Sequence, residues 1–206
     1  MRKIKLNIDS LSFKREGITV LKDISFDLEN GQMLWLQGAN GSGKTTILKI
    51  LAGIIRKFSG SLLFNDVDIC NTYKNYVKNV TYIGHQIACW PEKTVIENLK
   101  FWAHIRQTEE LLLATLNFFN LYSIADLPLY KLSSGWKKRT DLARLMIFNS
   151  KIWLLDEPMV NLDAKTKTFF NELFNTKLQN GGLIIIASHD ELDIKQSYCK
   201  KYSLDK

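Results

Sequence analysis

A glycine-rich segment of the chain has the residue types and the spacing of a phosphate-binding loop. Residues 38–45 read GANGSGKT, which fits G-x-x-x-x-G-K-[ST], with an apolar run before them and helical apolar spacing after them. Backbone N–H groups of such a loop can surround phosphate oxygens, and the following helix N-terminus favours their negative charge. A glycine turn without a ligand is the alternative, and the flanking strand and helix make it the weaker one. The predicted phosphate-binding residues are Gly38, Ala39, Asn40, Gly41, Ser42, Gly43, Lys44, Thr45 and Thr46.

Two adjacent carboxylates end a second apolar run, IWLLDE at 152–157. Neighbouring side chains of a strand point in different directions, so Asp156 and Glu157 can do different work. With Lys44 on the β- and γ-phosphates of a nucleotide, the Thr45 hydroxyl would bind Mg²⁺ and Asp156 would hold that ion through water. Glu157 would orient and polarise the attacking water. Alone, a strand followed by DEP can be a solvated turn; behind a phosphate-binding loop it indicates nucleotide hydrolysis.

A third segment, LSSGWKKR at 132–139, lies between these two and leads into an apolar helical pattern. With the three motifs in this order, the chain resembles the ATP-binding cassette (ABC) ATPases, whose signature is LSGGQ, over essentially its whole length. The resemblance implies that Ser133, Ser134 and Gly135 contact the γ-phosphate across a dimer of cassettes. Trp136 departs from the usual glutamine of the signature and removes an amide oxygen that could accept a hydrogen bond.

The resemblance also implies roles for residues outside these motifs. Gln86 matches the glutamine that senses Mg²⁺ and links to the membrane subunit, and His189 matches the histidine near the γ-phosphate. Residues 162–163, in VNLD, match the loop that crosses the dimer interface. The residue that stacks on adenine is left open between Phe13 and Arg15.

Three segments narrow the resemblance to the ATPase subunits of the haem exporter of cytochrome c biogenesis. They are GHQ at 84–86, SSGWKKR at 133–139 and WLLDEP at 153–158. This resemblance implies membrane-spanning partner subunits, two ATPase and two membrane chains in all, and ATP-dependent pairing of the cassettes. It implies a peripheral position on the cytoplasmic side of the inner membrane. No direct haem contact is expected of His85 or the cysteines, since a haem ligand needs a pocket and no C-x-x-C-H motif is present.

Other functions remain open at this point. The chain could serve another small ABC exporter, or be a soluble ABC ATPase acting on nucleic acid. The segment between Lys44 and Ser133 has room for a helical subdomain only, not for the long coiled coil of repair ATPases. A P-loop small-molecule kinase would not explain the signature or the DEP strand. We therefore expect no nucleic acid partner.

The elements that must position these motifs follow from the apolar pattern. We expect an α/β fold: a P-loop NTPase (ABC ATPase) core with a mostly parallel sheet, N-terminal antiparallel strands and a helical subdomain insertion. A single domain, 1–206, would contain this subdomain at roughly 88–149. Strands are expected near 4–8, 24–28, 33–36, 80–83, 152–155 and 183–187, and helices within 44–52 and 94–149.

Composition sets the outer limits of these interpretations. With 206 residues, 46% of them apolar, the chain can bury a real core, which excludes a disordered protein. The net charge of +7 suits anionic partners without choosing among nucleic acid, lipid and phosphorylated small molecules. The three cysteines lie far apart and indicate reduced thiols. No apolar run reaches the length of a membrane-spanning helix, and the N-terminus does not read as a signal peptide.

Overall fold

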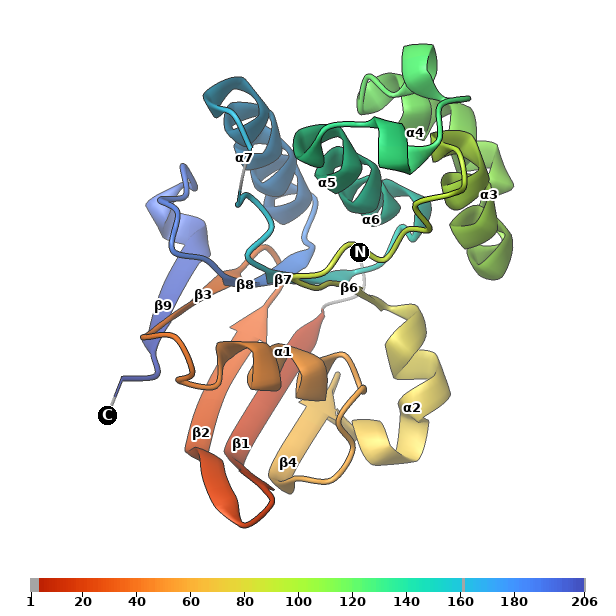
Figure 1. The fold of residues 1–206 in the computed structure, drawn as a ribbon. Coiled ribbons are helices and arrows are strands. Elements are labelled where there is room, and N and C mark those ends of the chain that lie inside the picture. The colour runs from red at the N-terminus through yellow and green to blue at the C-terminus, as the bar shows by residue number, and fades with distance from the viewer. Residues whose placement is uncertain (1–3, 161, 206) are drawn as a thin grey trace.

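A five-stranded parallel sheet forms the centre of the computed structural model, which describes residues 4–160 and 162–205 (Figure 1). Its strands follow the order β6-β7-β8-β3-β9, and every neighbouring pair is parallel. Every residue of β7 and β8 is buried, as continuous apolar runs predict for central parallel strands. The bounds are β3 Met33–Gln37, β6 Val80–Ile83, β7 Ile152–Asp156, β8 Leu183–Ala187 and β9 Cys199–Ser203.

A second sheet of four antiparallel strands lies below the first in the view of Figure 1, in the order β2-β1-β4-β5. Leu6 and Ile8 of β1 pair with Leu28 and Phe26 of β2. Leu6, Ile8 and Leu28 are buried, because the period of two puts them on the face toward the protein interior. The bounds are β1 Lys5–Arg15, β2 Ile18–Glu29, β4 Ser59–Phe64 and β5 Val67–Asp68.

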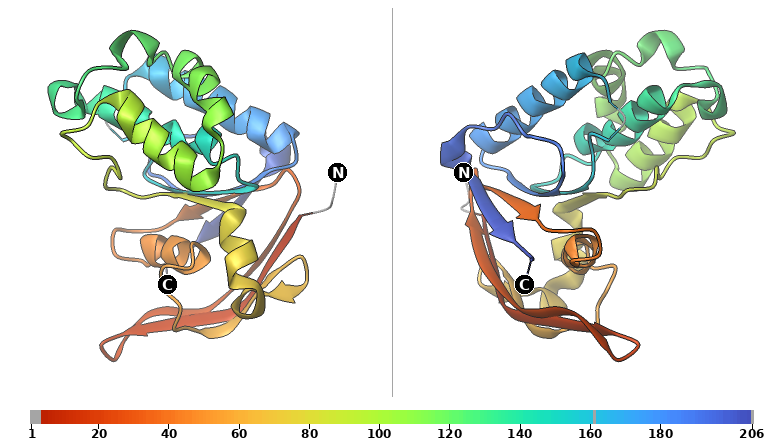
Figure 2. Two further views of the ribbon diagram at one scale, coloured as in Figure 1. Left: turned by 90° about the vertical axis from the view of Figure 1, so that its right-hand side faces the viewer. Right: turned by 60° about the vertical axis from the view of Figure 1, so that its left-hand side comes forward.

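Helices cover both faces of the parallel sheet (Figures 1 and 2), and the sheet separates two clusters of buried apolar side chains. Helix α1 (Lys44–Leu51) lies between the two sheets and buries Ile47, Leu48, Ile50 and Leu51 there. Helix α2 (Ile69–Lys78) packs at the edge of the antiparallel sheet. The other face carries α3 (Val95–Arg106), α4 (Leu112–Phe118), α5 (Ser134–Leu142), α6 (Arg144–Ile147) and α7 (Ala164–Gln179).

Short polar side chains begin three of the upper helices. Thr94 and Glu97 form a capping box at the start of α3, each accepting a backbone N–H of the other. Ser133 accepts from Trp136 N at the start of α5, and Asp163 accepts from Thr166 N at the start of α7. The motif residues Ser133 and Asp163 therefore also fix where their helices begin.

The expected fold class is confirmed, and the expected strands all form. Every described strand pair of the central sheet is parallel, whereas the sequence predicted a mostly parallel sheet. Sequence patterns did not predict β4, β5, α2 or β9. Strand β9 reads CKKYS and lies at the edge of the sheet with exposed lysines, so it lacks the apolar signal of a central strand. Within the described part of the chain, no helix has both the length and the apolar character needed to cross a membrane.

Candidate active site

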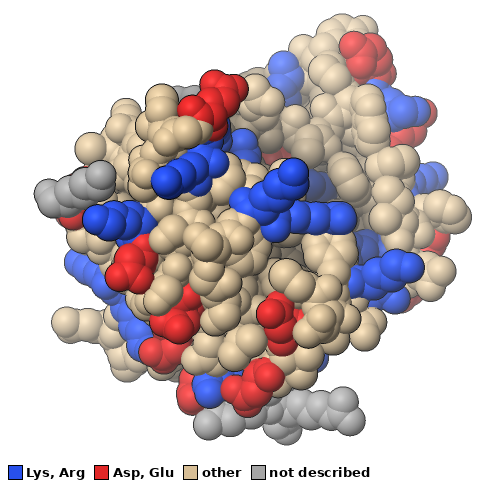
Figure 3. All heavy atoms as spheres, turned by 90° about the horizontal axis from the view of Figure 1, so that it is seen from below, with Lys and Arg blue, Asp and Glu red and all other residues tan. Residues whose placement is uncertain are grey.

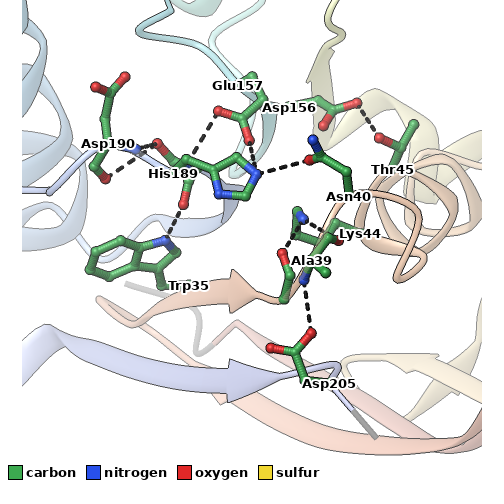
Figure 4. Close-up of polar contacts among 12 residues, drawn as sticks. Trp35, Ala39, Asn40, Lys44, Thr45, Asp156, Glu157, His189, Asp190 and Asp205 are labelled. Atoms are coloured by element: carbon green, nitrogen blue, oxygen red, sulfur yellow. Dashed lines mark hydrogen bonds and ion pairs between the residues drawn. The ribbon is translucent and has the colours of Figure 1, made fainter.

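The predicted catalytic motifs meet at the carboxyl ends of three adjacent parallel strands (Figure 4). The glycine loop follows β3, the two carboxylates end β7, and His189 follows β8. Ligands of open parallel sheets bind at this edge, because the loops after neighbouring strands converge there. A cleft of about 750 Å³ opens here and is lined by Lys44, Thr45, Thr46, Asp156, Glu157 and His189, together with Asn40, Gly41 and Gly43.

The glycine loop has the shape of a cradle for an anion. Gly41 has φ +85° with open space where a side chain would stand. Gly43 has φ +104°, and a Cβ there would come within 2.5 Å of the Leu21 side chain, so only glycine lets α1 start this close to β2. Buried Lys44 donates from Nζ to the Gly38 carbonyl at 2.5 Å, which keeps its charge at the loop.

Ser42 in the same loop has a buried hydroxyl without a hydrogen-bond partner among the described residues. A buried hydroxyl usually finds a partner. Phosphate oxygens beside a lysine and a helix N-terminus would supply acceptors, so the loop fits the polyphosphate of a nucleotide.

An oxygen pair beside the loop fits a hard divalent cation. Thr45 Oγ1 donates to Asp156 Oδ2 at 2.9 Å, which brings a hydroxyl from α1 against the carboxylate that ends β7. Mg²⁺ prefers such oxygen ligands and completes its shell with water and phosphate oxygens. Tyr82 of β6 also reaches Asp156 Oδ2, with its hydroxyl at 3.4 Å. Burial and the negative charge of Asp156 raise the pKa of Tyr82, so it remains a neutral donor.

Glu157 and His189 lie side by side at the cleft and contact each other (Figure 4). The backbone N–H of His189 donates to Glu157 Oε2 at 3.3 Å, and His189 Nε2 lies 3.7 Å from Glu157 Oε1 and 3.2 Å from Asn40 Oδ1. Both oxygens are acceptors, so the imidazole tautomer that fits carries its proton on Nε2. Glu157 has φ +49°, an unusual left-handed conformation that turns its side chain out of the strand register.

The loop around His189 is fixed from two sides. Trp35 Nε1 donates to the Ser188 carbonyl at 2.9 Å, directly before the histidine. Lys167 of α7 forms an ion pair with Asp190 at 2.6 Å, directly after it. The imidazole itself stays exposed at the cleft, so its backbone is held while its ring can turn toward a ligand.

The structure separates the two candidates for adenine contact. Arg15 and Val20 line the cleft of the glycine loop. Phe13 lines a different hollow, with Phe58 and Ser59, and packs partly against the lower core. A planar guanidinium can stack on a base, so Arg15 is the candidate that the geometry favours.

Two predicted site elements lie away from this cleft. Gln86 is exposed and lines a neighbouring hollow that it shares with Thr45 and Asp156. Ser133, Ser134 and Gly135 sit at the start of α5 above the sheet and do not line the cleft. Ser133 and Ser134 are exposed, so this helix start is open to a second molecule. Of the expected interface loop, Leu162 and Asp163 are described, and the residue before them lies outside the described part.

Sequence reasoning missed two polar contacts of the site. The backbone N–H of Ala39 donates to Asp205 Oδ1 at 2.8 Å, so the segment after β9 reaches the glycine loop. Tyr82 lies on β6, beside Asp156. Asp205 belongs to no motif, and its position depends on the pairing of β9 with β3, which the sequence did not reveal. Tyr82 could have been found, because it precedes the GHQ motif within a predicted strand.

Comparisons with known proteins agree with this geometry. A family model described as ABC transporter matches residues 21–160. The chain is 36% identical over 188 residues to the cytochrome c biogenesis ATP-binding export protein CcmA of Wolbachia pipientis wMel, covering 91% of each chain. It is 34% identical over 203 residues to the protein of that name from Haemophilus influenzae, covering 97% of this chain and 95% of the other.

One solved structure, titled as the ATP binding subunit of an ABC transporter, shares the fold. It superimposes with a TM-score of 0.80 at 24% sequence identity and covers 89% of this chain and 79% of its own. At that identity, the likeness supports the arrangement of the two sheets and the helices above them.

Proposed function

The chain belongs to the ABC transporter family as an ATP-binding, ATP-hydrolysing subunit, and we propose that it energises the export step of cytochrome c biogenesis. The observation that carries the proposal is the convergence of Lys44, Glu157 and His189 on one cleft, in a chain similar to CcmA proteins over nine-tenths of its length. The glycine loop and Lys44 would bind the phosphates of ATP, and Arg15 would stack on its base.

The residues of the cleft divide the chemistry among them. Glu157 stands where a carboxylate can accept a hydrogen bond from the attacking water and polarise it. His189, protonated on Nε2, can donate to a γ-phosphate oxygen as charge develops there. Thr45 and Asp156 would hold Mg²⁺, which when bound neutralises phosphate charge. Gln86, in the adjoining hollow with both metal-site residues, would sense that ion.

A second cassette would complete the site. Ser133, Ser134 and Gly135 do not line their own cleft, yet Ser133 and Ser134 are exposed at the N-terminus of α5, where backbone N–H groups favour an anion. We propose that they contact the γ-phosphate held by a partner copy, so that ATP joins two cassettes head to tail. Trp136, half-buried with the Arg139 guanidinium 4.9 Å from its ring, would shape this contact instead of binding phosphate.

Membrane-spanning subunits are the proposed partners, with two of them joined to two copies of this chain. An exposed aromatic group supports a protein contact near Gln86: Trp90 and Phe101 are 39% and 40% exposed, and their ring centroids lie 4.5 Å apart. Exposed apolar clusters of this kind mark interaction surfaces. We place the chain at the cytoplasmic side of the inner membrane, bound through these partners.

The cargo is proposed to be haem, and its recognition is assigned to the membrane subunits. His85 lines the nucleotide cleft, so its surroundings are those of a phosphate site. The three cysteines lie on α2, beside α5 and on β9, apart from one another. Direct haem binding by this chain is not part of the proposal.

A nucleic acid partner finds less support. Basic and acidic side chains are interspersed on the face seen in Figure 3. Nucleic acid binding calls for a stripe of one sign along a face. The surplus charge of +7 on this chain does not form such a stripe on that face.

The test is complementation of a host that lacks this chain. The wild-type chain should restore c-type cytochromes and should co-purify with a membrane-spanning protein after gentle detergent lysis. Lys44→Ala should co-purify equally well but restore no cytochrome, because it removes the phosphate-binding cation and leaves the outer surface unchanged. Normal cytochrome maturation supported by Lys44→Ala would contradict the function, and purification of the wild type free of any membrane protein would contradict the partners.

A further inference from the structure

Three charged side chains of the signature helix, which is α5 with its continuation α6, are buried where this helix passes the loop that carries Gln86. Lys138, Asp141 and Arg144 are 7%, 0% and 4% exposed. Their spacing of three residues puts them on one side of α5 and of α6, which continues it. Charged side chains are almost never fully buried unless they are paired. We call these three residues the charge ladder.

The charge ladder contacts the loop on both sides of Gln86. Lys138 Nζ donates to the Gly84 carbonyl at 3.4 Å, before the glutamine. The backbone N–H of Ala88 donates to Asp141 Oδ1 at 3.1 Å, after it. Gln86 itself stays exposed between these two attachments. The helix therefore contacts the backbone of the loop while the glutamine side chain remains available.

The carboxylate in the middle of the ladder joins its parts. Arg144 Nη2 lies 2.7 Å from Asp141 Oδ1, the oxygen that also accepts from the loop. The Arg144 guanidinium packs over the Trp102 ring at 5.2 Å. Asp141 Oδ2 is buried and has no hydrogen-bond partner among the described residues. Its negative charge offsets two buried cations, so the cluster depends on Asp141.

We propose that the charge ladder is a positioning device: it fastens the loop of Gln86 to the signature helix, so that both move as one unit. A phosphate of the partner cassette that engages Ser133 would then shift Gln86 of the same chain directly through α5. The role of Gln86 in this inference rests on the proposed function. The fastening itself is a property of the folded chain and needs no ATP hydrolysis.

Cys89 gives a readout of the fastening that is independent of activity. Its Sγ lies 4.0 Å from Asp141 Oδ1, one residue beyond the attachment at Ala88. Burial, and then the negative charge of Asp141, raise the pKa of the Cys89 thiol to about 12. The thiolate is the reactive form, so Cys89 should react slowly while the ladder is intact.

The first experiment measures maleimide labelling of Cys89 at pH 7.5 in a chain whose other cysteines, Cys70 and Cys199, are changed to serine. Asp141→Asn replaces the charged partner of Ala88 N–H and Arg144 by a neutral amide, which weakens both contacts, so the loop should open more often and labelling should speed up about threefold or more. Asp126→Asn, at an exposed position of the same helical region, is the matched control and should leave the rate unchanged. An unchanged rate in folded Asp141→Asn would overturn the fastening.

A second variant keeps the test decisive if Asp141→Asn does not fold. Lys138→Met retains the aliphatic stem and the Asp141–Arg144 pair and loses only the attachment at Gly84. It should speed labelling of Cys89 by about threefold or more through greater opening of the loop. Labelling of Lys138→Met at the wild-type rate, when Asp141→Asn cannot be measured, would overturn the proposal.

The second experiment asks whether the ladder acts through Gln86. In the assembled complex, Asp141→Asn, or Lys138→Met in its place, should lower kcat for ATP about fivefold with KM unchanged, and should cause no further loss in a Gln86→Ala background. Losses that multiply in the double variant would show a merely structural effect and overturn the positioning role. A wild-type complex without ATPase activity would contradict the proposed function instead, while the labelling result would still decide the fastening.

Discussion

Replacing Glu157 by glutamine separates nucleotide binding from hydrolysis in this cleft. An amide of the same shape can still accept the His189 backbone N–H, which now donates to Oε2 at 3.3 Å, so the loop geometry should persist. The glutamine cannot take a proton from water or polarise it as a carboxylate does. Loss of a positioned general base typically costs a factor of about 10²–10⁴ in rate. At 1.36 kcal/mol per factor of ten, this raises the barrier by about 2.7–5.4 kcal/mol.

Two assays on the same preparation test this prediction. Phosphate release by the assembled complex should fall at least about a hundredfold, while the Kd for ATP in a titration should stay within about a factor of two. Sedimentation should show ATP-dependent pairing of the Glu157→Gln chain, since ATP then joins the cassettes without being consumed. The exposed Glu191, close to the same cleft, provides the control: Glu191→Gln should hydrolyse ATP at the wild-type rate. Turnover by Glu157→Gln above about a tenth of wild type would refute the assignment.

Three further variants address the metal site, the signature and the stability of the chain. Thr45→Ala should raise the Mg²⁺ concentration for half-maximal ATPase activity about tenfold, and Thr45→Ser should not, because the serine keeps the hydroxyl that stands beside Asp156. Ser133→Arg should lower ATPase activity of the complex about tenfold or more yet leave ATP affinity of the isolated chain unchanged, because Ser133 lies outside its own cleft. Burial lowers the pKa of Lys177 to about 8, so its charge destabilises the fold below that pH and the penalty lifts as pH rises toward about 10.4. Lys177→Met loses the hydrogen bond from Nζ to the Ser150 carbonyl at both pH values, so the pKa shift predicts the difference: the change in the free energy of urea unfolding should be about 1–2 kcal/mol more favourable at pH 7 than at pH 10. An equal change at both pH values would contradict this reasoning.

The positions of Lys44, Asp156 and His189 relative to one another could be predicted because each lies at the end of, or shortly after, a strand with a continuous apolar run. The strands that precede them are short and continuous in apolar character, and β7 and β8 are buried at every residue. Parallel strands of this kind end at a common edge, so a motif after each one enters a shared site. Local sequence therefore carried enough information to assemble the centre of the cleft.

The contacts that sequence reasoning missed depend on neighbours far apart in the chain. Asp205 reaches Ala39 only because β9 pairs with β3, and β9 reads as a polar edge segment. The sequence predicted an apolar helical pattern after the signature and said nothing of the charged residues Lys138, Asp141 and Arg144, which are buried. Burial of charge is decided by the loop that packs against the helix, and no periodicity within the helix reports it.

The left-handed backbone at Glu157 lowers the stability of the fold at a residue that the proposed hydrolysis needs. An L-residue in that conformation costs about 1 kcal/mol or more relative to an ordinary one, whereas glycine and asparagine adopt it readily. A library selected for thermal tolerance or expression alone should therefore enrich glycine or asparagine at position 157. The variants selected in this way would be well folded and would not hydrolyse ATP. Directed evolution of this chain needs turnover in every round of screening, because stability by itself leads away from the enzyme.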